Sequence, residues 1–482
     1  MTECEVNENE LHKIALGACF LGSGGGGKLE TSFTFIKNYC DNLSEDEKKR
    51  KIHIVDLKDA TAGQSGIVVA YMGAPQKMDS IKCPDAVCEG IKKIMDYKNA
   101  DHIDYIIPVE IGPVSTITAC LAAHQMHMQV LNVDGAGRAV PTLDLISYTT
   151  TAHVSVNPTF LCSENENENK KPPETPVYHQ IKLEIFGDKK PGAVFSDDTD
   201  SGAASKMESL ARPVLNMAEF DQKAGLVMWY FDDVTKLKDI PHASVPETLT
   251  FCRELGGAIQ SMQKQNMGFP EIENLFSKEL FKSQSIYPAI KEKYPAIKEM
   301  CRGKLISATI STAGGFDAGV ITIEGDSSIK DYSGHQYTII FQNESLILWD
   351  SNSAQPLVMA PDLICYLIDY GKYVFTNGDI MRGDALKEEL HKKEIVVYGI
   401  AAPRALMESE SNMIKHKKKL CNTIAGEEHN ALPKHYMSIL NNIGYYGSCK
   451  SLKEKNKHLK KIPTAGAAGI PLSLKETTLS IN

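Results

Sequence analysis

Between residues 52 and 133, short apolar runs rich in β-branched residues alternate with segments whose apolar residues recur at helical spacing. Strands are predicted at Ile52–Leu57, Gly66–Met72, Tyr105–Glu110 and Gln129–Val133, and helices at Asp85–Tyr97 and Ser115–His127. This alternation is typical of βαβ units, which form a mainly parallel sheet with helices packed on it. We therefore expect a Rossmann-like α/β domain in which Tyr105–Glu110 and Gln129–Val133 are adjacent parallel strands.

Three of these strands end in glycine-containing segments with polar neighbours. The segments are Met72-Gly73-Ala74-Pro75, Glu110-Ile111-Gly112 and Asp134-Gly135-Ala136-Gly137-Arg138. Open α/β sheets bind ligands outside the carboxyl ends of their strands. The sequence therefore predicts a small-molecule site where these three segments converge.

A glycine-rich turn, Gly22–Lys28, follows an amphipathic helix predicted at Glu10–Leu21 and precedes a second helix. It matches G-x-G-x-x-G and the start of a P-loop, but a helix precedes it where a strand is required, and Leu29 replaces the Ser or Thr that contacts magnesium. Successive glycines still allow N–H groups to face one cavity, with the positive end of the next helix behind them. We expect the turn to form one pocket with Gly73, Gly112 and Asp134; a plain tight turn is the alternative.

Asp134, Glu110 and Arg138 are the candidate catalytic residues. A carboxylate can activate water, and a second carboxyl can stay protonated when it is partly buried. Arg138 suits a carboxylate or an imide carbonyl. The structural alternatives are an Asp that caps the Gly135–Gly137 turn, a Glu that binds backbone amides and an Arg in an ordinary salt bridge.

Histidines and cysteines give no comparable signal. His124 and His127 lie one helical step apart, but spacing indicates no third ligand, so we predict exposed imidazoles and no metal site. Cys162, Cys252 and Cys301 are interpreted as buried structural thiols.

The second half of the chain is dominated by runs with strand character. They are Gln180–Phe186, Gly225–Phe231, Lys304–Ser311, Gly319–Glu324, Gln336–Gln342, Leu346–Trp349 and Glu394–Ala401, interrupted by a helix at Pro246–Lys264. Ser163–Pro176 is a polar, proline-bearing stretch that reads as a solvated loop. The predicted division is an N-terminal α/β domain of residues 1–178, a β-rich α+β domain of residues 179–405 and a partly disordered C-terminal extension of residues 406–482.

Charge and composition exclude several classes of function. The 52 Lys and Arg against 61 Asp and Glu give a net charge of −9, which argues against a general nucleic-acid surface. No apolar run approaches the roughly 20 residues that span a bilayer, and the N-terminus is acidic where a secretory signal is basic and apolar. Twelve irregularly spaced cysteines fit reduced thiols. We expect a cytoplasmic protein without membrane or nucleic-acid partners, and a homo-oligomer is compatible with the sequence.

Motifs in both halves of the chain resemble, in order, the S-methyl-thiohydantoin desulfurase family, a former domain of unknown function often encoded beside hydantoinase/oxoprolinase genes. The motifs are LGSGGGGK (Leu21–Lys28), MGAP (Met72–Pro75), VEIG ending at Gly112, VDGAGRAVP (Val133–Pro141), GGFDAGVITIEG (Gly314–Gly325), FQNESLI (Phe341–Ile347) and APDLICYL (Ala360–Leu367). The resemblance implies hydrolysis of a 2-methylthio-imidazolone to a hydantoin with release of methanethiol, and a hydantoinase/oxoprolinase-type partner.

The resemblance and the strand-end argument together assign roles to named residues. Asp134 is the candidate base, Glu110 the candidate acid or orienting group, and Arg138 with the Gly24–Gly26 amides the candidate charge stabilisers. The candidate substrate-binding residues are Gly24, Gly25, Gly26, Gly73, Gly112, Ser115 and Asn132.

This chain departs from the family pattern at several positions. Asn132 replaces the first Asp of Asp-x-Asp-Gly, Pro113 and Ser115 replace a Gly and an Asn, and Thr142 replaces an acidic residue. Asn132 and Thr142 favour the alternative of a catalytically degenerate ligand-binding or accessory subunit. A nucleotide-binding protein is a third alternative, and the identity of any cofactor stays open.

Overall fold

The computed structural model describes residues 2–5, 7–73, 75–163, 178–185, 202–265, 297–313, 316–353, 356–369 and 371–407. The loop expected at Ser163–Pro176 lies outside these residues from position 164, and the expected extension of residues 406–482 lies outside them from position 408.

Four parallel strands form the centre of the N-terminal sheet. They are β2 (Lys51–Val55), β3 (Gly66–Gly73), β4 (Tyr105–Pro108) and β5 (Gln129–Leu131). Their spatial order is β2-β5-β4-β3, and each neighbouring pair is parallel. Tyr105 stands opposite Gln129 in the β4–β5 pair, which confirms the predicted adjacent parallel strands and the βαβ connection between them.

Antiparallel strands extend this centre on both sides. They are β1 (Thr2–Glu5) beside β2, and then β9 (Lys223–Phe231), β7 (Thr159–Cys162) and β8 (Gln180–Leu183) beyond β3. The α/β fold class is confirmed, with parallel pairing confined to the centre of the sheet. Assigning Gln180–Phe186 and Gly225–Phe231 to the second domain was wrong, because β8 and β9 hydrogen-bond into the first sheet. The expected boundary at residue 178 therefore does not coincide with the division between the sheets.

Helices cover both faces of this sheet. On one face lie α1 (Glu8–Leu21), α2 (Leu29–Asn42), α4 (Asp85–Lys98), α5 (Pro113–Met126) and α9 (Thr248–Gln265). On the other lie α6 (Ser147–Thr150), α7 (Ala203–Leu215), α8 (Lys236–Asp239) and α11 (Arg404–Met407). Because side chains alternate along a strand, Ile67 and Val69 of β3 join the first core and Val68 and Ala70 the second.

Short elements complete the N-terminal domain. They are α3 (Glu45–Lys49), the 3₁₀ turns Leu57–Asp59, Pro75–Ser80 and Leu143–Leu145, and the two-strand ladder of β6 (Val133–Asp134) with β10 (Val245–Pro246).

The C-terminal domain is one antiparallel sheet with its own core. Its strands, in spatial order, are β15 (Val358–Met359), β14 (Glu344–Asp350), β13 (Gln336–Gln342), β12 (Phe316–Gly325), β11 (Ile297–Ala313), β20 (Glu394–Ile400), β16 (Leu363–Ile368) and β17 (Tyr373–Val374), with β18 (Met381–Arg382) and β19 (Ala385–Leu386) beside β11 and a 3₁₀ turn at Glu388–Leu390. All of its pairings are antiparallel, so the predicted β-rich second domain is confirmed.

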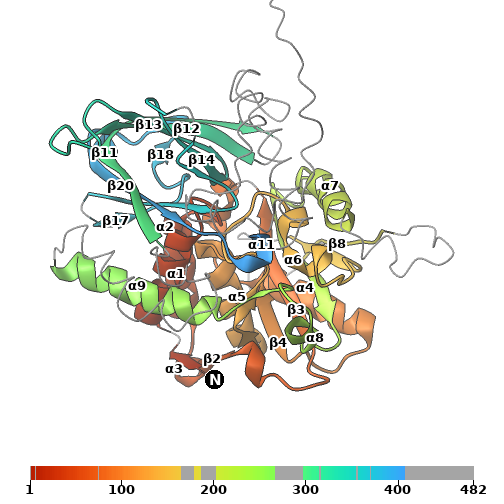
Figure 1. Ribbon diagram of the computed structural model, residues 1–482. Helices are drawn as coiled ribbons and strands as arrows, with labels where there is room; N and C mark the ends of the chain where they lie inside the picture. Colours follow the sequence, from red (N-terminus) through yellow and green to blue (C-terminus); the bar gives the residue numbers. More distant parts are fainter. Residues whose placement is uncertain are drawn as a thin grey trace, which may run out of the picture.

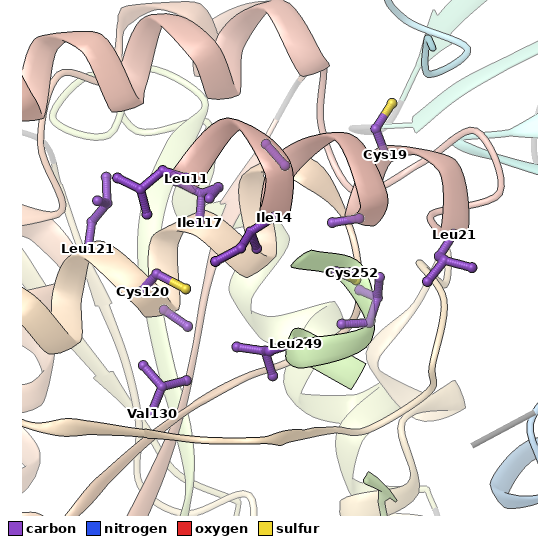
Figure 2. Close-up of a cluster of buried hydrophobic side chains, with 14 of the residues drawn as sticks. Leu11, Ile14, Cys19, Leu21, Ile117, Cys120, Leu121, Val130, Leu249 and Cys252 are labelled. Carbon is purple, nitrogen blue, oxygen red and sulfur yellow. The ribbon is translucent and has the colours of Figure 1, made fainter. Parts of the chain in front are cut away.

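Helix α1 lies where the two domains meet (Figure 1). The sequence predicts an amphipathic helix, but every residue from Ile14 to Leu21 is buried. On one side α1 packs against α5 and α9, where Leu11 and Ile14 lie close to Ile117 and Leu249 (Figure 2). On the other side it meets β16 of the C-terminal sheet. The turn that follows α1 therefore starts inside the domain junction. No helix of the described residues is long and apolar enough to cross a membrane.

Candidate active site

The glycine-rich turn between α1 and α2 touches both domains. Three of its glycines have φ between +77° and +87°, a region that other residues rarely adopt. A Cβ atom on Gly26 would lie 2.3 Å from the Cα atom of Gly112, and a Cβ atom on Gly25 would lie 2.1 Å from Oε1 of Glu344. The turn is therefore more than a tight connection between helices, because its backbone contacts a strand end of one domain and a carboxyl group of the other.

Hydrogen bonds fasten the turn to the C-terminal domain. Ser23 makes two of them. Its backbone carbonyl oxygen accepts from the N–H of Ser345 at 2.7 Å, and the hydroxyl oxygen of its side chain accepts from the N–H of Ile364 at 2.9 Å. The carbonyl oxygen of Gly24 accepts from the N–H of Asn377 at 2.8 Å.

A cavity of about 140 Å³ lies between the turn and the C-terminal domain. Since a cavity of about 150 Å³ can hold a benzene molecule, there is room for one small ring. Its wall includes the sequence-predicted residues Gly24, Gly25, Gly26, Gly73, Glu110 and Ser115, and Gly112 lies directly behind Gly26. The C-terminal domain contributes Asp317, Asn343, Glu344, Thr376, Asn377 and Gly378. The structure thus brings the turn, Gly73 and Gly112 together, but Asp134, Asn132 and Arg138 do not line the cavity.

Three amides of the turn have no hydrogen-bond acceptor among the described residues. The N–H of Gly25 bonds the carbonyl of Gly22 at 3.0 Å, whereas the N–H groups of Gly24, Gly26 and Gly27 donate to none of the residues that the structure describes. Unpartnered amides at a cavity wall suit negative charge on a ligand.

The positive end of α2, expected behind the turn, is already occupied by the protein. The carboxylate of Asp379, from the C-terminal domain, accepts hydrogen bonds from the N–H groups of Leu29 at 2.8 Å and Glu30 at 3.2 Å. Any anion-binding capacity at this place therefore comes from the glycine amides and not from the helix end.

Glu110 follows β4 on the N-terminal wall. Its Oε2 accepts from the N–H of Val140 at 2.7 Å, and its Oε1 accepts from the hydroxyl of Ser115 at 3.2 Å. Burial, and then the negative charge of Glu344, raise the pKa of Glu110 well above its usual value. The protonated form of Glu110 is favoured, as expected of a carboxyl group that serves as an acid.

Glu344 faces the same cavity from the first position of β14 and is only 2% exposed. The buried charge of Arg138 interacts electrostatically with Glu344. The cavity thus brings together one carboxyl group from each domain, Glu110 and Glu344, and of these Glu110 has the raised pKa that suits an acid.

Arg138 is 1% exposed and fastens the domains together. Its guanidinium donates to the backbone carbonyls of Ala139 at 2.8 Å, Pro361 at 3.0 Å, Asp362 at 2.9 Å and Ser345 at 3.3 Å. Burial lowers its pKa. The expectation that Arg138 clamps the ligand does not fit this geometry, because the side chain is engaged with backbone oxygens; its influence on the cavity is electrostatic.

The side chain of Asp134 stabilises the turn that follows it, Gly135–Gly137. Its Oδ2 accepts from the N–H groups of Ala136 at 2.9 Å and Gly137 at 2.6 Å, and the side chain is fully buried. Burial raises its pKa to about 7. This is the structural alternative considered for Asp134, and the residue is not positioned to activate water in the cavity.

Asn132 holds the start of helix α9 in place and is not part of the cavity wall. Its Oδ1 accepts from the N–H groups of Leu249 at 3.0 Å and Thr250 at 3.3 Å, and its Nδ2 donates to Asp56 Oδ1 at 2.7 Å. Placing Asn132 among the substrate-binding residues is therefore not supported by its contacts. Thr142 is likewise not part of the cavity wall.

The histidine and cysteine predictions had different outcomes. His127 is exposed at the end of α5, but His124 is buried, with Nδ1 2.7 Å from the hydroxyl of Tyr39; predicting it exposed was wrong because α2 and α3 cover that end of α5. Cys162, Cys252 and Cys301 are buried, as predicted. Among the described residues no three His, Cys, Asp or Glu side chains group as metal ligands.

The sequence interpretation missed the C-terminal half of the wall. Asn343 and Glu344 lie within FQNESLI and Asp317 within GGFDAGVITIEG, two segments already singled out by resemblance. The four polar residues Gln342–Ser345 between two apolar strand runs were the available signal.

Comparisons with known proteins agree with this architecture. Residues 9–170 match the family model described as S-Me-THD-like, N-terminal domain, and residues 202–414 match S-Me-THD-like, C-terminal domain. A crystal structure of a protein from Chromobacterium violaceum is similar at 24% sequence identity and a TM-score of 0.67, covering 90% of this chain and 99% of that one; at this identity it shows the fold. The search of curated proteins found no match.

Proposed function

Because the chain belongs to the S-Me-THD-like family, we propose that it hydrolyses an S-methyl thiohydantoin to a hydantoin and methanethiol. The observation that carries the proposal is the pairing of Glu110 and Glu344 in a cavity with room for one small ring. One carboxyl group comes from each domain, and the raised pKa of Glu110 favours a proton on that group.

In the proposed reaction, water adds to the ring carbon that bears the methylthio group. A C–O bond forms, Glu344 takes a proton from the water, the C=N electron pair moves to the ring nitrogen, and that nitrogen takes the proton of Glu110. The C–S bond then breaks as the new carbonyl forms. The hydroxyl proton returns to Glu110, and methanethiolate leaves with the proton held by Glu344, so both carboxyl groups regain their starting states.

The amides of Gly24, Gly26 and Gly27 support this assignment, since donors aimed at developing negative charge lower the barrier of such additions. Glu344 replaces Asp134 as the proposed base, because Asp134 is bound to its own turn. The degenerate-enzyme alternative was suggested by Asn132 and Thr142, and neither residue lines the cavity. A hydantoinase-type partner, which would consume the product, is a proposal from family resemblance alone.

The direct test is to incubate the purified protein with a 2-methylthio-imidazol-4-one and measure methanethiol with a thiol reagent and hydantoin by chromatography. Glu110→Gln and Glu344→Gln should each lower kcat by about 10²–10⁴-fold, the usual cost of removing a positioned acid or base. Glu208→Gln is the matched control, because Glu208 is buried on α7 outside the cavity wall. Hydantoin binding by the wild type without turnover would instead identify a binding protein, and an equal loss in Glu208→Gln would remove the carboxyl argument.

A further inference from the structure

Asn343 occupies the turn between β13 and β14 with φ of +56°. Its Oδ1 accepts from the N–H of Asp317 at 2.9 Å, and its own N–H donates to the carbonyl of Asp317 at 2.6 Å. The side chain of Asn377 donates to its carbonyl at 2.9 Å. Backbone and amide oxygen of Asn343 are therefore held in one orientation on the cavity wall.

The amide nitrogen of Asn343 is not used in this arrangement. None of the described residues accepts a hydrogen bond from its Nδ2, whereas Asn377, on the same wall, uses both ends of its amide, donating to Asn343 and accepting from the hydroxyl of Tyr366 at 3.0 Å. Each of the other side-chain donors on the wall has an acceptor within the protein. Lys28 donates to Asp79, Tyr71 to the carbonyl of Cys83, Ser115 to Glu110 and Thr376 to Asp379.

The backbone conformation of Asn343 adds a second reason to look for a role. Asn reaches the left-handed region more readily than most residues, but glycine does so without strain. Asn343 therefore has a side chain where glycine would fit without strain. The oxygen of that side chain binds Asp317, and the side chain stands on the cavity wall.

We propose that Asn343 Nδ2 donates a hydrogen bond to the ring carbonyl oxygen of the substrate. This inference rests on the proposed function. It makes Asn343 the residue that favours substrates with a carbonyl group next to the reacting C=N bond. In the tautomer where these bonds are conjugated, addition of water moves electron density through the ring nitrogen onto the carbonyl oxygen. A donor at that oxygen therefore binds the transition state more strongly than the ground state.

Kinetics of two variants test the catalytic part. Asn343→Asp keeps the oxygen that accepts from Asp317 and loses the donor, and Asn343→Gly suits the positive φ and removes the side chain. Both should lower kcat by about 10- to 100-fold, the range for a hydrogen bond to a group that gains charge, with a smaller change in KM. Asn99 is an exposed residue with φ of +51° that caps the C-terminal end of α4. Asn99→Gly is therefore the control for replacing a left-handed Asn and should keep wild-type turnover.

Calorimetric binding separates this inference from the proposed reaction. Hydantoin and imidazolidin-2-one share one carbonyl, and only hydantoin carries the second. The wild type should bind hydantoin more tightly than imidazolidin-2-one. In Asn343→Gly this preference should fall by about two- to tenfold, the range for a hydrogen bond between neutral groups, while the variant melts within a few degrees of the wild type. Equal weakening for both compounds, or unchanged hydantoin binding, overturns the role of Asn343. Absence of turnover in the wild type, with the preference present and lost in the variant, would overturn only the proposed reaction.

Discussion

The carboxylate of Asp379 accepts a hydrogen bond of 2.8 Å from the backbone N–H of Leu29. A residue of the C-terminal domain thereby caps the first turn of α2, a helix of the N-terminal domain whose own preceding residue, Lys28, provides no side-chain cap. The same carboxylate accepts from the N–H and hydroxyl of Thr376, so one buried group orders both walls of the cavity.

Asp379→Ala should destabilise the protein by about 1–2 kcal/mol, as expected for loss of a helix cap, and Asp379→Asn should cost less because one acceptor remains. Urea denaturation followed by circular dichroism measures this difference. If Asp379→Ala unfolds at the wild-type midpoint, the contact between the domains contributes nothing to stability.

Asp134→Asn should leave turnover near the wild-type level, because Asn still accepts from the N–H groups of the Gly135–Gly137 turn. Its stability should depend differently on pH. The folded-state pKa of Asp134 is about 7, above the value of about 4 in an unfolded chain, so the wild type loses stability as pH rises from about 4 to about 7. Melting temperatures measured at pH 5 and pH 8 check this: relative to the wild type, the melting temperature of the variant should be higher at pH 8 than at pH 5. A loss of turnover beyond 100-fold would restore Asp134 as the base.

Asn132→Asp recreates the Asp-x-Asp-Gly pattern of the family but should not raise turnover. The new carboxylate would face Asp56 at the position where Nδ2 now donates at 2.7 Å, and it would lose the bond to the hydroxyl of Thr250. We expect a destabilisation of about 1–3 kcal/mol at neutral pH, smaller at pH 4.5, where one of the two carboxyls can be protonated. Denaturation at both pH values, with turnover corrected for folded fraction, checks this; a tenfold rise in turnover would favour the degenerate-enzyme alternative.

Turnover should fall as pH rises through the raised pKa of Glu110, because only the protonated carboxyl can supply a proton to the ring. The charge of Glu344 contributes to that raised pKa, so Glu344→Gln should move the titration of Glu110 to lower pH. Carbon-13 NMR of labelled glutamate carboxyls can follow this without turnover, with assignment by Glu110→Gln. Glu208→Gln should leave the Glu110 titration in place, and a Glu110 carboxyl that titrates at its ordinary value in the wild type would contradict the acid assignment.

The sequence predicted that the glycine-rich turn shares a pocket with the strand ends at Gly73, Gly112 and Asp134, because ligands of open α/β sheets bind at that edge; the turn does meet Gly73 and Gly112 there, but Asp134 does not line the cavity. It did not predict that Asn132 and Asp134 lie outside the cavity wall. Asp and Asn at a strand end are equally suited to bind a ligand and to accept hydrogen bonds from nearby backbone, so residue type alone does not separate the two roles. Glu344 was missed for a different reason. It reaches the site through β14, more than 200 positions along the chain from Glu110, and periodicity says nothing about which face of one domain meets another.

Glu110 belongs to the N-terminal domain and Glu344 to the C-terminal domain, so the pKa of Glu110 depends on how closely the two domains approach each other. Separating the domains would remove the repulsion by Glu344 and hydrate Glu110, and both changes lower its pKa. Any separation of the domains would therefore favour release of the Glu110 proton to solvent. Heats of binding measured in buffers of different ionisation enthalpy would report whether a ligand changes the protonation of this pair.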